Sequence, residues 1–113
     1  MYSLHQSQAK VLNLPGRVVK VLVGNGKLSS KHMTLGITEV PPQSSMTPHA
    51  HQGEEEIIVI IQGFGEVNVG GTTEKLEPST AVVFPDGVTH AISNMSNDVM
   101  RFVFCFYPCH NFG

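Results

Sequence analysis

The sequence is poor in cysteine and in basic residues, and it contains no long apolar run. Seven lysines and arginines stand against nine acidic residues, for a net charge of -2. This argues against binding to a nucleic-acid backbone, which requires clustered basic charge. No segment approaches the roughly 18 apolar residues of a membrane span, and no basic leader followed by an apolar core opens the chain. We therefore expect a cytoplasmic protein with no nucleic-acid or membrane partner.

The two cysteines, Cys105 and Cys109, are too few for the disulfide framework of a small secreted domain. With His110 they form a segment that could suggest zinc. A closed structural zinc site needs four ligands at suitable spacing, which this segment does not supply. The sequence instead predicts a buried Cys105 within a strand and an exposed thiol at Cys109.

Helical periodicity is also missing, and short apolar or alternating segments recur about every ten residues between glycines and prolines. This pattern is typical of an all-β sandwich or barrel. The 113 residues suffice for one core, with residues 1–16 as an N-terminal arm or edge strand and residues 17–113 as a single barrel domain. The expected strands are residues 18–23, 32–40, 57–61, 66–69, 73–76, 81–84, 90–93 and 99–107.

Two of these segments carry further expectations. Residues 81–84 are apolar and indicate a buried strand. Residues 99–107 are apolar on both faces apart from Arg101, so one face should fill the barrel while the other packs elsewhere. The second face predicts a homodimer joined by sheet-to-sheet packing, with exchange of the N-terminal strands as one possible mechanism.

The residues with the clearest chemistry lie between positions 49 and 90. His49 and His51 are two apart, so in an extended strand they point to the same face. Glu56 follows at the start of an apolar run, and His90 adds a third imidazole. These are ligand types of a first-row transition metal. The alternatives are a polar surface loop for the first three and, for His90, a core histidine bonded to a backbone carbonyl.

Two motifs in this region resemble those of the cupin superfamily. The first is His49-x-His51-x4-Glu56-x6-Gly63, and the second is Pro85-x-Gly87-x2-His90-x3-Asn94. The 15 residues between Gly63 and Ser79, where the second motif begins, resemble the short gap of small single-domain bacterial cupins. The family usually has glycine where Ser79 stands, which puts the tightness of that corner in question. Asn94 should tie a turn by hydrogen bonds rather than touch a substrate.

The resemblance implies a double-stranded β-helix (jelly roll) of about ten strands that holds one divalent transition metal. The metal ligands would be His49, His51, Glu56 and His90. Three nitrogens and one carboxylate oxygen suit Fe, Mn, Ni, Co, Cu or Zn better than Ca or Mg, which prefer oxygen ligands. We choose Glu56 over its neighbours Glu54 and Glu55 because its spacing to Gly63 is that of the family.

The function expected from this site is metal-dependent chemistry on a small molecule. Oxygen-dependent cleavage needs little beyond the metal and an apolar cavity, whereas sugar isomerisation or epimerisation also needs a positioned acid or base. Only His32 and Glu39 offer themselves for that role, so the sequence favours dioxygenase-like chemistry. A non-catalytic cupin that binds a ligand or metal is the alternative, and the intact ligand set argues against a purely structural role. Candidate pocket residues, for which ordinary core packing is the other interpretation, are His32, Met33, Met46, Phe102, Phe104, Phe106 and Tyr107.

Overall fold

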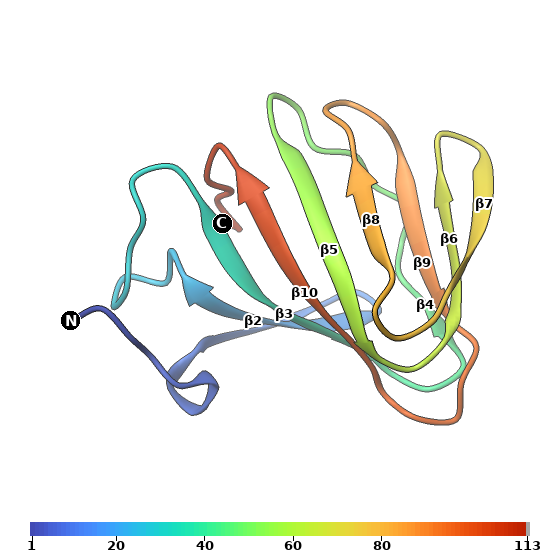
Figure 1. Ribbon diagram of the computed structural model, residues 1–113, viewed down its shortest axis with the longest axis horizontal. Coiled ribbons are helices and arrows are strands. Elements are labelled where there is room, and N and C mark those ends of the chain that lie inside the picture. Colours follow the sequence, from blue (N-terminus) through green and yellow to red (C-terminus); the bar gives the residue numbers. More distant parts are fainter. Residues whose placement is uncertain (113) are drawn as a thin grey trace.

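The computed structural model describes residues 1–112 and consists almost entirely of antiparallel strands in two sheets that pack against each other (Figure 1). The six-stranded sheet has the order β1-β2-β3-β10-β5-β8, and the four-stranded sheet has the order β4-β9-β6-β7. A short 3-10 turn, η1, is the one helical element of the described residues. The expected jelly roll of about ten strands is confirmed. The elements are η1 (Gln6–Gln8), β1 (Lys10–Leu14), β2 (Arg17–Val23), β3 (Thr34–Val40), β4 (Ser44–Ser45), β5 (Glu55–Gln62), β6 (Gly65–Val69), β7 (Thr72–Leu76), β8 (Ala81–Phe84), β9 (His90–Asn94) and β10 (Met100–Tyr107).

Strand β5 shows how the sequence builds the core. Its side chains alternate between the two faces of the sheet, as those of any strand do. Ile58 and Ile60 are buried between the sheets, whereas Ile57 and Val59 are 50% and 46% exposed on the outer face. The same alternation on β10 buries Phe102, Phe104 and Phe106 in the interior. The interior is therefore apolar along most of its length.

The outer face of the six-stranded sheet corrects two expectations. Cys105 is half-buried rather than buried, because its position in the alternation of β10 directs it outward. Strand β8 is the edge strand after β5, and its alternation buries Phe84 but directs Ala81 and Val83 to the outer face, where they are exposed rather than buried. Cys109 is exposed and unbonded, as expected.

Strand β3 begins at Thr34, two residues later than expected, and turns its smaller side chains inward. Thr34, Gly36 and Thr38 are buried, while Leu35 and Ile37 lie on the outer face. Glycine is required at position 36 in this orientation, because a Cβ there would clash with the backbone oxygen of Lys20 and would lie 2.5 Å from the ring of Phe104. Small residues on the inner face of β3 thus leave room for the large rings of β10.

Asn94 ties the end of β9 to two other segments, which confirms the expectation from its motif. Its side-chain amide donates to the carbonyl oxygens of Val40, Pro41 and Asp98, and its carbonyl oxygen accepts from the backbone and hydroxyl of Ser96. The corner at Ser79 is tight, with a φ of +72° that is unusual for a residue with a side chain.

Strand β1 pairs with β2 at the edge of the larger sheet, with Leu14 opposite Arg17. The division of the chain into an N-terminal arm and a barrel stays a prediction. Within residues 1–112, no helix has the length and hydrophobicity that a membrane crossing would need.

Candidate metal centre

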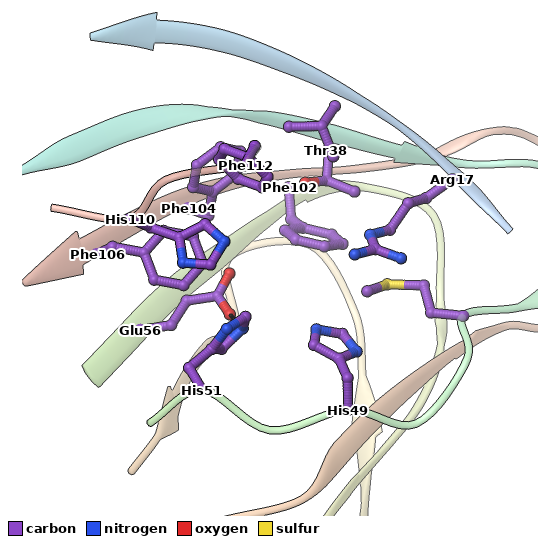
Figure 2. Close-up of a pocket in the computed structure, with 12 residues that line it drawn as sticks. Arg17, Thr38, His49, His51, Glu56, Phe102, Phe104, Phe106, His110 and Phe112 are labelled. Carbon is purple, nitrogen blue, oxygen red and sulfur yellow. Dashed lines mark ion pairs between the residues drawn. The ribbon is translucent and has the colours of Figure 1, made fainter. Parts of the chain in front are cut away.

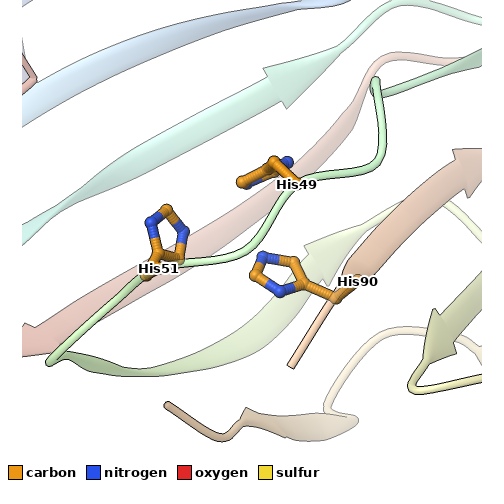
Figure 3. Close-up of side chains that lie close together, drawn as sticks. All are labelled: His49, His51 and His90. Carbon is orange, nitrogen blue, oxygen red and sulfur yellow. The ribbon is translucent and has the colours of Figure 1, made fainter. Parts of the chain in front are cut away.

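Three histidines from two distant segments converge inside the barrel (Figure 3). His90 is the first residue of β9, and His49 and His51 lie in the segment that leads from β4 to β5. The backbones of His49 and His90 exchange hydrogen bonds of 3.0 and 2.8 Å, which form an isolated bridge. His49 and His51 thus lie outside a regular strand, but one ring nitrogen from each of the three histidines lies within 4.8 Å of the others.

Backbone carbonyls fix the orientation of two of these rings. The Nδ1 of His49 donates to the carbonyl oxygen of Thr47 at 2.9 Å, and the Nδ1 of His90 donates to that of Val88 at 3.2 Å. A carbonyl oxygen only accepts, so Nδ1 carries the proton in both rings. The Nε2 lone pair is then available to a metal, which is the usual arrangement of metal-binding histidines.

Glu56 adds a carboxylate to the same place from the inner face of β5. It is 7% exposed, and its Oε1 lies 3.4 Å from the Nε2 of His51 and 3.6 Å from the Nε2 of His90. Burial alone would raise the pKa of Glu56, but the attraction of His51 and His90 outweighs it, so the pKa is lowered and the group stays ionised. Burial, reinforced by the neighbouring cationic groups, lowers the pKa of His49 despite the hydrogen bond to Thr47.

The residues fit a metal ion. The Nε2 atoms of His51 and His90 are buried and have no hydrogen-bond partner within residues 1–112. Buried polar atoms without a partner are uncommon and call for an explanation such as an ion. Imidazole nitrogens beside a carboxylate oxygen form a donor set that first-row transition metals prefer. These side chains could therefore hold a metal ion.

The neighbouring glutamates take different positions, as the alternation of β5 requires. Glu55 is exposed on the outer face. Glu54 lies just before the strand, and its Oε1 is 2.6 Å from the Nδ1 of His110. Of the three adjacent carboxylates, Glu56 is the one that lies against both His51 and His90.

A cavity of about 30 Å³ opens beside the histidines and is walled largely by aromatic rings (Figure 2). Four of the expected pocket residues line it: Met46, Phe102, Phe104 and Phe106. His32, Met33 and Tyr107 do not, which corrects those predictions. Met33 and Tyr107 are 45% and 59% exposed, and His32 is also exposed. His32 and Met33 precede β3, and Tyr107 follows the inward-facing Phe106 and so points to the other side.

His110 is a pocket residue that the sequence did not reveal. It belongs to the tail after β10, and its backbone nitrogen donates to Thr34 Oγ1 at 2.9 Å. Its ring stacks on Phe106, with centroids 4.4 Å apart, and contacts Glu54 as described above. His51, Glu54 and His110 thereby form a second group of donors within 4.8 Å of one another. In the sequence, His110 stood beside two cysteines, and nothing there indicated that the tail folds back over the cavity.

Arg17 is the second missed residue. It opens β2, and its side chain lines the cavity on the side away from Glu56 and His110 (Figure 2). A signal was present, because Arg17 follows a Pro15-Gly16 turn and precedes an apolar strand, where alternation could direct it inward.

Comparison with known proteins supports the interpretation of these motifs. A family model described as "Cupin domain" matches residues 36–106, which include all four candidate ligands. The tetracenomycin polyketide synthase protein TcmJ of Streptomyces glaucescens is 34% identical over 74 residues, or 66% of this chain and 50% of that protein. The chain therefore spans about half the length of that relative. The oxalate-binding protein of Thermotoga maritima is 25% identical over 100 residues, or 79% of this chain and 83% of that protein. The solved structure of KdgF from Halomonas sp. has the same fold, with a TM-score of 0.81 at 19% identity over 98% of this chain and 96% of that chain.

Proposed function

Since the chain belongs to the cupin family, we propose that it binds one divalent transition metal and acts on a small molecule held beside the ion. The proposed ligands are His49, His51, His90 and Glu56. The observation that carries the proposal is the pair of buried, unpartnered Nε2 atoms of His51 and His90, both close to the same oxygen of Glu56. A bound ion would supply a Lewis acid for a carbonyl or an anionic oxygen.

The geometry favours a reaction with proton transfer, of the isomerase or epimerase type. The sequence favoured dioxygenase-like chemistry because it offered no convincing acid or base. The pair of His110 and Glu54 supplies one, since the carboxylate holds Nδ1 and orients the ring. Nε2 is then the ring atom that can take up or release a proton at the pocket. His32 and Glu39, the earlier candidates for this role, do not line the cavity.

Dioxygenase-like chemistry is the second candidate, because the cavity wall of Phe102, Phe104 and Phe106 is as apolar as such a reaction requires. Non-catalytic binding is the third. The named relatives support a small-molecule ligand in general terms, since one is called an oxalate-binding protein and another a polyketide synthase protein.

One set of measurements distinguishes these functions. Metal-loaded protein is incubated with a panel of 2-oxo acids, diketones and sugars in heavy water, and with catechols, diketones and thiols under oxygen. Deuterium incorporation that falls in His110→Gln while metal content is unchanged supports proton-transfer chemistry. Oxygen uptake supports a dioxygenase, and ligand-induced thermal stabilisation with neither supports a binding protein. A wild-type protein that retains no metal rules out the metal-dependent functions.

We also propose that the protein forms a homodimer through the outer face of the six-stranded sheet. Ile57, Val59, Ile61 and Val83 are exposed together on this face, beside the half-buried Val103 of β10. Exposed apolar patches of this kind commonly mark an interface. Sedimentation at micromolar concentration should give a mass of twice 12.3 kDa, and Val59→Lys should lower the measured mass towards that of the monomer. A wild-type mass near 12.3 kDa would contradict the dimer.

A further inference from the structure

The position of Arg17 is fixed by the turn before it. Pro15 and Gly16 join β1 to β2, and Gly16 has a φ of +74°. A Cβ on Gly16 would lie 2.8 Å from the carbonyl oxygen of Ser45, so the turn packs tightly against β4 and requires glycine. This contact holds Arg17 at the cavity, where Figure 2 shows its guanidinium pointing inward beside His49.

Arg17 lacks an acidic partner, unlike the two cations on the outer face of the same sheet. Lys20 and Arg101 both pair with Glu39, at 3.3 and 3.1 Å. Within residues 1–112, no carboxylate oxygen lies within ion-pair distance of Arg17, whose Nη1 donates to the carbonyl oxygen of Pro15 at 3.2 Å. The positive charge of Arg17 is therefore not neutralised by an ion pair within the described residues.

The surroundings of Arg17 make this lack of a partner costly. Its side chain is half-buried, and Met46 and Phe102 line the same cavity. Burial lowers the pKa of Arg17, and the negative charge of Glu56 across the cavity offsets part of that effect. A cation withdrawn from water is stabilised by an anion that replaces the lost solvation.

We infer that Arg17 binds the carboxylate of a small ligand, and that a further oxygen of the ligand, outside the carboxylate, faces the histidines. A guanidinium presents paired N–H donors whose spacing matches a carboxylate. The cavity of about 30 Å³ is small, which favours a small ligand. A 2-hydroxy or 2-oxo acid meets both conditions. A single guanidinium in a small, largely aromatic cavity favours such a singly charged acid over the more highly charged phosphate.

This inference rests on the proposed function only for the ligand oxygen outside the carboxylate, which would face the metal centre. The carboxylate subsite itself depends on Arg17 and can be measured with or without metal. Glycolate, a small 2-hydroxy acid, and its neutral amide glycolamide are nearly equal in size and differ in charge, so they are the matched probes. Inorganic phosphate tests the alternative anion.

The test is calorimetric titration of wild type, Arg17→Met, Arg17→Lys and the outer-face control Arg101→Met, each metal-loaded and metal-free. We expect glycolate to bind wild type and Arg101→Met at least about tenfold more tightly than it binds Arg17→Met, as the loss of a charged hydrogen-bonded contact predicts. Arg17→Lys should be intermediate because it keeps the charge and loses the paired donors. Glycolamide should bind weakly and equally to all four, and metal content should not change.

The inference is overturned if glycolate fails to bind wild type, if Arg17→Met binds glycolate as wild type does, if glycolamide binds as tightly as glycolate, or if phosphate binds more tightly. The proposed metal centre fails separately, if wild type holds no metal. In that event, glycolate binding that still requires Arg17 would support the carboxylate subsite on its own.

Discussion

The replacement Asn94→Ala should cost the metal-free protein about 2–4 kcal/mol of unfolding free energy. Asn94 is 2% exposed, and its side chain joins the end of β9 to Val40, Pro41 and Asp98. Although three carbonyl oxygens surround Nδ2, its two hydrogens allow about two full bonds, and Oδ1 accepts two more from Ser96. Four bonds at about 0.5–1.5 kcal/mol each amount to about 2–6 kcal/mol, and we expect the lower part of this range because the carbonyl contacts to Pro41 and Asp98 are only part-buried.

Urea denaturation of the metal-free protein measures the effect, with an unchanged slope showing that the unfolding reaction is the same. Asn97→Ala in the same loop is the control, because Asn97 is exposed and should cost no more than about 0.5 kcal/mol. Folded Asn94→Ala should still bind metal with wild-type stoichiometry, since Asn94 positions a turn and is not a ligand. A loss below about 1 kcal/mol would refute the hydrogen-bond argument.

Three further predictions concern the corner and the carboxylates. Ser79→Gly should raise the free energy of unfolding by about 0.5–1 kcal/mol in thermal or urea unfolding. Glycine removes the strain of the positive φ, and the greater entropy of the unfolded glycine chain cancels only part of this gain. A lower free energy of unfolding would contradict this. Glu56→Gln should weaken metal binding sharply, whereas Glu54→Gln and Glu55→Gln should keep one ion per chain; metal loss in Glu55→Gln but not in Glu56→Gln would mean that the carboxylate is wrongly assigned. In a pH titration of metal release, the midpoint should lie below 6.5, because protons compete with metal for His49 and burial lowers its pKa from that value; a midpoint well above 6.5 would contradict this.

Much of the fold follows from residue order alone. The apolar run of residues 57–61 and the turn residues at regular spacing place strands close to where they lie, and the alternation of side chains along any strand assigns their faces, since these signals are local. The same alternation separates the buried Glu56 from the exposed Glu55. The resemblance to the two cupin motifs also implied that His90 lies near His49, although no local property of either segment shows that they pair.

Two features that the sequence did not predict depend on packing between distant segments. Thr34 and Thr38 face inward together with Gly36, which must accommodate Phe104 from β10. That contact depends on the register between two strands more than sixty residues apart. The place of His110 likewise depends on a tail that folds back onto Thr34 and Glu54, and no period or motif in the sequence encodes such a contact.

Metal content, measured by elemental analysis after chelation and reloading near neutral pH, tests the central claim most directly. Wild type and the control His32→Ala, whose side chain lies outside the cavity, should each retain one divalent transition metal per chain. His90→Ala should retain almost none, because it removes the ligand that joins β9 to the segment of His49 and His51. Wild-type protein that retains no metal, or His90→Ala that retains a full equivalent, would contradict the proposed centre.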